Sequence, residues 1–586
     1  MSDFASYDIA FAVRAVTTSN LQATLAVLAI ISVLTLSIHR LCFHPLRSHP
    51  GPLLARVTSL PDLYHAYRGD KHIHFLHLHA KYGPVVRFAP NSLSINDPAA
   101  LRAIYSHGAN VQKSESFYHA FRAFPTAIST LLATERVHHA RKRRIMGQAF
   151  SEGAMRDLEK YVLENVRVWE REVGCRVEAA VKEGAKWTAG VDMGKWCNYL
   201  VFDIMGDLVF GKSFGTLGDR PENRDAIHLL GRAARRNYTI GAMPFLHRTG
   251  LERWIPPFRG LCLDRLQYFA FAKRQVIERS QNTSLDTSGR KDIFHYLLNA
   301  KDPETGESLP KSELFMEGNT LIVAGSDTSS TTISATLYHL LNNKACIERL
   351  ASEVRSTFDD MEEIRAGAKL HTCAYLRACI DEAMRMSPAV PGLLPRLVLP
   401  GGLDIPALGL RIPAGVDVGT CTYAIHHHQD YVASPFTYDP SRWLQRPSSA
   451  KSHRRQRSDS GVALRQSSPS SSSDDNESPH SLKESQHGLH RKQHEDYAAL
   501  QSVFAPFSLG NRACLGKPLV YMEISIAIAR LVWKYDMRLV DVPPVDASVR
   551  ADVKNGRRRE GEYQLRDWFL SANEGPVVQF AERLSI

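Results

Sequence analysis

One cysteine, Cys514, lies in the short segment that most constrains how this chain can fold. The segment runs from Phe507 to Gly516 as Phe-Ser-Leu-Gly-Asn-Arg-Ala-Cys-Leu-Gly and leads directly into a helical stretch. Gly510 and Gly516 allow close backbone turns, and the free N–H groups and dipole of a helix N-terminus favour an anionic sulfur. Phe507 can shield that sulfur, and Arg512 can meet the anionic edge of a cofactor. The pattern favours an iron-bound thiolate over a buried structural cysteine, the usual fate of a lone cysteine.

The composition is that of a globular protein with a large core. Of the 586 residues, 44% are hydrophobic and 23% are charged, which excludes a wholly disordered chain, a collagen-like fibre and a multi-span membrane protein. Nine scattered cysteines without a Cys-x-x-Cys pair argue against a disulfide scaffold or zinc module and indicate a reducing compartment. The net charge of +11 predicts an acidic partner or an anionic membrane surface. Because long basic runs are lacking, nucleic acid is not an expected partner.

An uncharged stretch near the N-terminus predicts one transmembrane anchor over residues 15–38, since a helix needs roughly 20 residues to cross a bilayer. The stretch is followed by bulky and basic residues and not by a small-residue cleavage site, which favours a retained anchor over a cleaved signal peptide. A Pro-rich exit linker is expected over residues 39–59, and it carries three arginines. The positive-inside rule therefore predicts a cytosolic body and a short lumenal N-terminus over residues 1–14.

The rest of the chain, residues 60–586, is expected to form one large, mainly α-helical domain with small β-sheets. Apolar residues recur at three- and four-residue spacing, for example from Leu158 to Trp169. Extended segments at 85–88 and 93–95 flank a Pro-Asn turn and predict a hairpin, and residues 410–418 predict another extended region.

A change of composition marks residues 447–495, which are rich in Ser, Arg, His and Gln. The segment has little to bury, so we expect a disordered insertion within the domain. A regulatory phosphorylation tract around Ser458 is the alternative interpretation.

The ten residues that end at Gly516 match the pattern Phe-x-x-Gly-x-Arg-x-Cys-x-Gly at every specified position. On this motif the chain resembles the cytochrome P-450 superfamily of haem-thiolate monooxygenases, and residues 202–211 and 423–427 are similar to fungal microsomal members. The resemblance implies one haem-thiolate catalytic domain over residues 60–586 behind the transmembrane anchor. It also implies haem b (iron protoporphyrin IX) as the cofactor, with Cys514 as the axial ligand of its iron.

A second segment, Ala324–Ser329, lies in a stretch with a helical pattern over residues 312–343. A threonine in mid-helix commonly bonds back to a carbonyl four residues earlier. The segment also resembles the family's oxygen-activating helix. That resemblance implies that Gly325 lets the haem approach and that Asp327 and Thr328 form a proton relay.

Glu382 and Arg385 are three residues apart on an expected helix, which alone indicates an ordinary surface pair. The same spacing recurs at Glu164, so it is not specific. By resemblance, Glu382 and Arg385 join Arg442 in the family's buried structural triad. Ser441 stands where the family commonly has Glu, which puts a flanking contact in doubt.

The basic run His139–Arg144 indicates either a solvated helix face or a cofactor contact. By resemblance Arg143 pairs with a haem propionate, and Arg396 and Arg512 are the other candidates. The remaining basic residues of the run are expected to form a docking face for an acidic reductase. They are Arg141, Lys142 and Arg144.

The resemblance implies a monooxygenase that inserts one oxygen atom from O2 into an apolar small molecule, expected to be a secondary-metabolite intermediate. Electrons would come from NADPH through a separate NADPH-cytochrome reductase. The expected location is the endoplasmic reticulum membrane, with a single pass and a cytosolic catalytic domain. Candidate pocket residues by position in the resembled fold are Phe117, Phe121, Phe124, Val323, Val390, Leu393, Leu394 and Phe569.

Three alternatives stay open. A haem-thiolate isomerase or dehydratase would act on peroxides without a reductase, and a haem-binding sensor or electron carrier would leave Asp327 and Thr328 unexplained. Gly211–Gly215 matches the Gly-x-Ser-x-Gly elbow of serine hydrolases, with Ser213 as the nucleophile. That elbow needs a strand before the serine, whereas the sequence predicts a helix before it and a loop after it.

Overall fold

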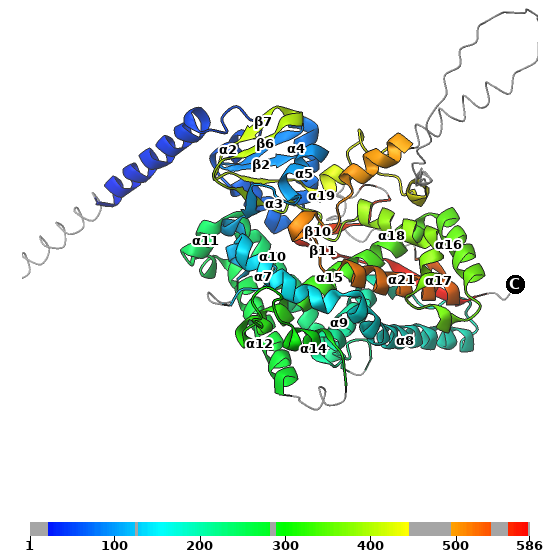
Figure 1. Cartoon of the computed structure of the whole chain (residues 1–586). Helices are drawn as coiled ribbons and strands as arrows, with labels where there is room; N and C mark the ends of the chain where they lie inside the picture. The colour runs from blue at the N-terminus through cyan, green and yellow to red at the C-terminus, as the bar shows by residue number, and fades with distance from the viewer. Residues whose placement is uncertain are drawn as a thin grey trace, which may run out of the picture.

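The computed structural model describes residues 21–122, 127–218, 220–281, 289–444, 494–540, 559 and 561–583. Over these residues the body is mainly α-helical with small β-sheets, as the sequence predicts (Figure 1). The expected lumenal residues 1–14 and residues 447–493 of the expected insertion lie outside the described part. The last two insertion residues, His494 and Glu495, instead begin a helix over residues 494–503.

The helices of the body differ widely in length, and two of them, α8 and α15, exceed thirty residues. Their bounds are α2 Leu53–Val57, α3 Leu60–Arg68, α4 Lys71–Tyr82, α5 Pro98–Tyr105, α6 Glu115–Tyr118, α7 Arg136–Gly147, α8 Glu152–Lys182, α9 Met193–Phe210, α10 Arg224–Ala242, α11 Pro244–Arg248, α12 Pro256–Gln281, α14 Ile293–Asn299, α15 Lys311–Asn342, α16 Lys344–Thr357, α17 Ala368–Thr372, α18 Ala374–Met386, α19 Thr422–His426 and α21 Lys517–Lys534.

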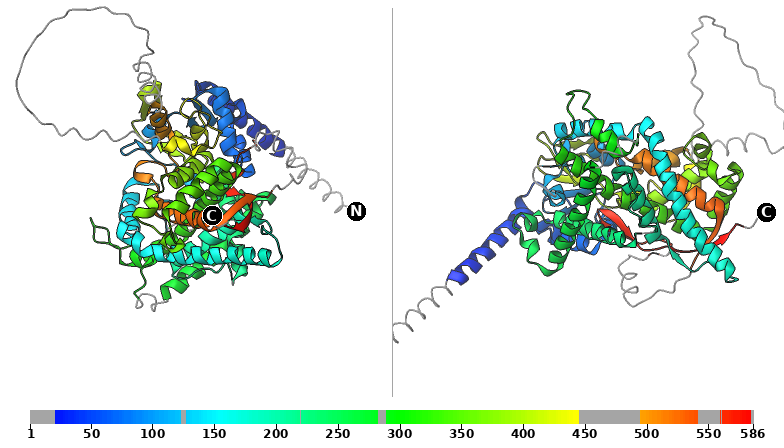
Figure 2. Two further views of the ribbon diagram at one scale, coloured as in Figure 1. Left: turned by 90° about the vertical axis from the view of Figure 1, so that its right-hand side faces the viewer. Right: turned by 90° about the horizontal axis from the view of Figure 1, so that it is seen from below.

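The apolar N-terminal helix is described from Leu21 to Phe43 and extends away from the body in every view (Figure 2). It is long and apolar enough to cross a membrane. The helix continues beyond the predicted anchor through a π-helical segment, His39–Phe43. The buried guanidinium of Arg87 donates to the Arg40 carbonyl at 3.0 Å, which ties this end of the helix to the body.

Within the described residues, four small sheets flank the helices. The largest has the order β1-β2-β8-β5-β3, in which β2 and β8 run parallel and the other pairs antiparallel. The predicted hairpin is confirmed as β1 and β2, and the predicted region 410–418 contains β7 and most of β8. The sheets contain β1 Val85–Ala89, β2 Ser92–Ile95, β8 Asp417–Gly419, β5 Arg396–Val398 and β3 Val111–Lys113; β4 Val191–Asp192, β12 Val577–Glu582 and β9 Tyr535–Leu539; β6 Leu403–Ile405 and β7 Leu410–Ile412; and β10 Leu565–Trp568 and β11 Leu570–Asn573.

Helix α15 forms the centre of the helical core and packs against α9, α12, α18 and α21. Its bounds agree with the predicted stretch to within one residue at each end. Many of its buried residues carry hydroxyls, which would be costly to bury without partners. Thr332 and Thr336 resolve this by donating to the carbonyls of Thr328 and Thr332, at 2.9 and 2.7 Å.

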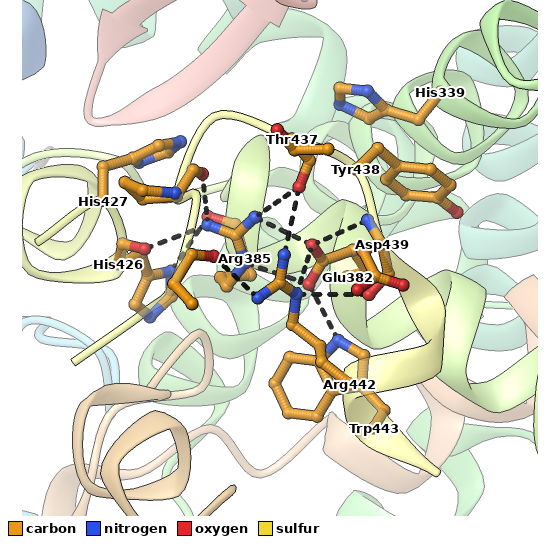
Figure 3. Close-up of polar contacts among 12 residues, drawn as sticks. His339, Glu382, Arg385, His426, His427, Thr437, Tyr438, Asp439, Arg442 and Trp443 are labelled. Atoms are coloured by element: carbon orange, nitrogen blue, oxygen red, sulfur yellow. Dashed lines mark hydrogen bonds and ion pairs between the residues drawn. The ribbon is translucent and has the colours of Figure 1, made fainter. Parts of the chain in front are cut away.

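A buried carboxylate, Glu382 on α18, holds the segment before the cysteine loop against the core (Figure 3). Arg385 donates to both Glu382 oxygens at 2.8 and 2.9 Å, and Arg442 donates to one of them at 3.0 Å. The indole of Trp443 donates to the other oxygen at 2.8 Å. Glu382 and Arg385 are fully buried, so the three residues lie together as the resemblance implies. Ser441, which stands where the family commonly has Glu, donates its backbone N–H to the Asp439 carboxylate.

A second buried carboxylate, Glu523 on α21, faces α15. The Ser329 hydroxyl donates to one Glu523 oxygen, and the other oxygen has no hydrogen-bond partner among the described residues. Burial raises the pKa of Glu523 to about 8, so its carboxyl is largely protonated at neutral pH. This contact links α15 to the helix that directly follows Cys514.

Replacement of the triad carboxylate should destabilise the protein strongly. Glu382→Gln leaves the fully buried guanidinium of Arg385 and the partly buried one of Arg442 without their anion, so we expect a loss of about 3–5 kcal/mol in the free energy of unfolding. Glu164→Gln is the control, because Glu164 is exposed, and its effect should stay within about 0.5 kcal/mol. Denaturant unfolding of the holoprotein measures both. Equal stability of the two variants would contradict the structural role of the triad.

Replacement of Glu523 should change the pH dependence of stability. The folded state holds this proton up to about pH 8, whereas the unfolded chain releases it near the ordinary pKa of 4.5. The unfolded state therefore binds fewer protons between these values, and stability falls as the pH rises through that window. Glu523→Gln removes this pH-dependent loss of stability. The difference in unfolding temperature, variant minus original protein, should therefore increase between pH 6 and pH 8.5. A difference that is independent of pH would contradict the raised pKa.

Candidate functional site

The loop that carries Cys514 is held against the end of α5. The Cys514 N–H donates to the Phe507 carbonyl at 2.9 Å, which closes the loop on itself. Gly510 has φ +63°, and a Cβ there would lie 2.3 Å from the Tyr105 carbonyl oxygen. A glycine is required at this position because both the backbone conformation and the close approach exclude a side chain. The short helix η9, Gly510–Arg512, then leads to Cys514 at the start of α21.

The Cys514 sulfur lies at the N-terminal end of α21. Burial raises the pKa of its thiol, whereas the N–H groups of Gly516 and Lys517 and the charge of Arg143 act in the opposite direction. A coordinated metal ion deprotonates a thiol outright, so these groups suit a metal-bound thiolate. The Phe507 ring packs 5.4 Å from the ring of Tyr521, on the α21 side of the loop.

Cys514 and Thr328 line one cavity of about 280 Å³. Most of its lining is apolar and comes from α10, α12, α15, the segment after α18 and the β10–β11 turn. Several of the predicted pocket residues lie along it, and these are Phe121, Val323, Val390, Leu394 and Phe569. The cavity therefore suits an apolar molecule next to the cysteine.

Two of the predicted pocket residues lie elsewhere, and a third, Phe124, is outside the described residues. Phe117 packs in an aromatic cluster, with its ring 5.1 Å from Tyr118 and 5.9 Å from Tyr238. Leu393 is buried so tightly that a Cβ on Gly419 would lie 2.6 Å from its side chain. Both predictions were based on position in the chain, which does not fix the direction of a side chain.

The hydroxyl of Thr328 has the local contact that is usual for a helical threonine. It donates to the Ala324 carbonyl at 2.8 Å, and the residue lines the cavity at the same time. Its oxygen can still accept a hydrogen bond. Asp327 does not line the cavity, but burial raises the pKa of its carboxyl to about 7. A group with that pKa can both give and take protons at neutral pH.

Gly325 faces a neighbouring helix and is not part of the cavity lining. A Cβ at this position would lie 2.4 Å from the sulfur of Met205, so the glycine allows α15 to approach α9. The neighbouring residue, Ala324, lines the cavity instead. The motif correctly predicts small residues on α15. It does not predict which of them faces the cavity.

Three cations converge on one part of the cavity lining: Lys113, Arg396 and Arg512. Ion pairs to carboxylates are absent at all three within the described part of the chain, and Arg512, for example, donates to the Thr134 carbonyl at 2.9 Å. Burial and the charge of Arg396 together lower the pKa of Arg512 to about 10. Burial and the two neighbouring arginines lower the pKa of Lys113 well below its ordinary value. Sequence reasoning missed Lys113, because a single lysine in a short strand carries no local signal.

The same cations also line a second, adjoining cavity, together with Arg143 and His139. Arg143 donates to the Ala513 carbonyl at 2.7 Å and thereby holds the residue before Cys514. The site thus offers one thiol, an apolar space beside it and uncompensated positive charge at an edge. These features fit an iron porphyrin that carries two carboxylates, because each buried charge needs a partner of opposite sign.

The expected basic docking face on α7 is wrong. Lys142 is fully buried and pairs with Glu313 at 2.8 Å and Glu317 at 3.3 Å, both on α15. Arg144 pairs with Asp302 at 2.8 Å, and Arg141 pairs with Glu307 at 3.1 Å. Burial removes Lys142 from the predicted face, whereas Arg141 and Arg144 remain partly exposed and are paired with carboxylates of neighbouring elements.

The serine-hydrolase alternative is also wrong. Ser213 follows the helix α9 and not a strand, and its hydroxyl accepts a hydrogen bond from the Gly215 N–H at 3.1 Å. The strand-turn-helix geometry that exposes a nucleophilic serine is therefore missing here.

Comparison with known proteins identifies the family. The family model for cytochrome P-450 matches residues 49–457 and 490–554. Cytochrome P-450 monooxygenase AKT7 of Alternaria alternata is 36% identical over 95% of this chain and 96% of its own length. Cytochrome P-450 monooxygenase atnE of Emericella nidulans is 34% identical, with 97% and 98% covered. Cytochrome P-450 monooxygenase apf7 of Gibberella fujikuroi is 34% identical, with 94% and 96% covered.

A solved structure shares the fold. The crystal structure of the cytochrome P450DA heme domain matches with a TM-score of 0.64 and 17% identity, over 92% of this chain and 98% of that chain. The chain therefore belongs to the cytochrome P-450 monooxygenases, a family of haem-binding oxidoreductases that use O2 and a redox partner to act on small molecules.

Proposed function

We propose that this protein inserts one oxygen atom from O2 into an apolar intermediate of secondary metabolism, with electrons from NADPH through a separate NADPH-cytochrome reductase. The observation that carries the proposal is the shared cavity, in which the Cys514 sulfur and the Thr328 hydroxyl lie along one largely apolar lining. The apolar lining supports the substrate class, since such cavities bind by burial of apolar surface.

In this proposal the Cys514 sulfur would bind the haem iron. A haem with a thiolate ligand supplies the activation of O2 when it is bound. Phe507 and Gly516 shape the loop around the sulfur. The haem carboxylates would pair with the positive edge formed by Arg396 and Arg512, with Lys113 and Arg143 beside them.

Thr328 and Asp327 are the proposed proton relay. The hydrogen bond to the Ala324 carbonyl orients the Thr328 hydroxyl. The hydroxyl oxygen can then accept a hydrogen bond from a proton donor in the cavity. Asp327 is a partly buried acid whose pKa is raised to about 7, which allows it to exchange protons at neutral pH. An isomerase or dehydratase that acts on a peroxide substrate would need neither this relay nor NADPH.

The first test concerns the ligand. Cys514→Ala should abolish the long-wavelength Soret band of the reduced carbonyl complex, because that band requires sulfur ligation. Cys175→Ala is the matched control, since Cys175 is exposed on α8 and should leave the band unchanged. Persistence of the band in Cys514→Ala would overturn the ligand assignment.

The second test separates oxygen activation from haem binding. Thr328→Val keeps the shape of the side chain but deletes the hydroxyl, so the carbonyl spectrum should be retained. Product formation per NADPH should fall by about 10²- to 10⁴-fold, the usual effect of losing a positioned proton donor, while peroxide is released. Thr336→Val is the control, because it removes a similar hydroxyl that bonds to a helix carbonyl but lies outside the cavity lining. This variant should keep the product formation per NADPH of the original protein. Turnover of a peroxide substrate without reductase would favour the isomerase.

We also propose that the protein is anchored in the endoplasmic reticulum membrane by a single pass, with the catalytic domain in the cytosol. The apolar Leu21–Phe43 helix and the arginines that follow residue 39 support this topology. The full chain should remain in microsomes after alkaline carbonate extraction, and protease added to intact microsomes should digest the haem domain. A domain that is protected from protease would reverse the orientation.

A further inference from the structure

Among the described residues, three buried side chains of the cavity lining have a polar atom without a hydrogen-bond partner, and two of them, Tyr268 and Asn319, are on the helices of one wall. Tyr268 is 2% exposed and Asn319 is 6% exposed, and both line the cavity that contains Cys514. The Tyr268 hydroxyl and the Asn319 side-chain carbonyl oxygen have no hydrogen-bond partner within the described ranges. The third atom is the hydroxyl of Thr420, which directly follows β8, so the helix-lined, largely apolar wall has two polar atoms that helix packing does not explain.

The two residues belong to the same wall. Tyr268 is on α12, and its ring packs with Leu230 of α10 and Val323 of α15. Asn319 is one helical turn before Val323 on α15, so the two share a helix face. The wall therefore lies where α10, α12 and α15 meet.

An unpartnered buried polar group is unfavourable, and native proteins rarely retain one without a ligand, a water or a functional role. Phenylalanine and leucine would occupy these two positions without that cost. The presence of a hydroxyl and an amide therefore points to a group that enters the cavity and pairs with them. A hydroxyl group suits both, because it can accept from Tyr268 and donate to the Asn319 oxygen.

The charge around this wall favours a neutral group over a carboxylate. Burial is the main reason why the pKa of Tyr268 is raised, and the nearby charge of Asp327 adds to it. Tyr268 therefore stays a hydrogen-bond donor at physiological pH. An anionic substrate group placed against Tyr268 would be repelled by the carboxylate form of Asp327.

Building on the proposed monooxygenase function, we propose that the substrate is an apolar molecule with a neutral hydroxyl group, which Tyr268 and Asn319 bind and which thereby orients the apolar remainder toward Cys514. Both residues determine specificity and take no part in the chemical step. A site built to pair a hydroxyl discriminates strongly against the analogue that lacks it, because its own polar groups are then left unpaired.

The experiment uses the full-length ferric holoprotein and matched probes: 1-dodecanol, dodecane and dodecanoate, and the bulkier pair farnesol and farnesene. Displacement of water from the haem iron, followed in the Soret region, gives each Kd. We expect each alcohol to bind roughly 10-fold or more tightly than its hydrocarbon and dodecanol to bind more tightly than dodecanoate. In Tyr268→Phe/Asn319→Leu the advantage of the alcohol should fall to about 2-fold or less, with hydrocarbon binding unchanged or tighter.

Stability provides a readout that does not depend on the probe. Because the two polar groups have no protein partner, Tyr268→Phe and Asn319→Leu should keep or raise the unfolding temperature of the ligand-free holoprotein. Tyr238→Phe is the matched control, since its buried hydroxyl donates to Asp567 at 2.9 Å, and it should lower that temperature. A drop for Tyr268→Phe as large as that for Tyr238→Phe would mean that the hydroxyl is already paired by structural water.

The remaining outcomes are distinct. No binding of either alcohol, equal binding of alcohol and hydrocarbon, or an unchanged preference in the double variant would each overturn this inference. If the original protein also lacks the sulfur-ligated carbonyl spectrum and NADPH-dependent turnover, the proposed function fails as well. If the spectrum and turnover are present without a preference for the alcohol, the inference alone fails.

Discussion

The geometry of the cavity depends on one buried carboxylate, Glu382, which joins the helical core to the chain that leads toward the cysteine loop. Two guanidinium groups and one indole donate to its oxygens, so the charge is stabilised without water. Its helix, α18, also packs against α15 and α21. Because protein cores are close-packed, a shift of α18 would move both neighbours. The network therefore determines where Thr328 of α15 and Cys514 at the start of α21 lie relative to each other.

Charge at the cavity edge adds a second constraint. Lys113, Arg396 and Arg512 are close enough for each to affect its neighbours, and the lowered pKa values of Lys113 and Arg512 follow from burial and this repulsion. A chain that brings such cations together without carboxylates loses stability by doing so. A bound haem with two carboxylates offsets that loss, and a ligand that binds the folded state stabilises it. In this arrangement the cofactor contributes to the fold as well as to the chemistry.

The features that could be predicted from sequence are those with a local signature. The cysteine loop follows from a motif in which each position has its own steric or electrostatic requirement, and the long helix around Thr328 follows from its helical pattern. The triad of Glu382 has no such local signature and is predicted only by resemblance to the family. The predictions that differ from the structure concern the direction in which side chains point from their helices. Gly325 faces Met205 and Lys142 is buried against α15, because neighbouring helices decide which side of a helix is covered. Lys113, Tyr268 and Asn319 escaped notice for a related reason, since each is unremarkable until the fold brings it to the cavity.

In the proposed mechanism, proton supply and substrate recognition would be coupled at the wall formed by α10, α12 and α15. Burial raises the pKa of Asp327 to about 7, and the Tyr268 hydroxyl has no hydrogen-bond partner among the described residues. A substrate carboxylate bound at Tyr268 would raise the pKa of Asp327 further, and the acid would then hold its proton at neutral pH. A neutral hydroxyl satisfies Tyr268 without adding charge. Recognition of a neutral alcohol is thus the form of binding that leaves Asp327 able to exchange protons near neutral pH.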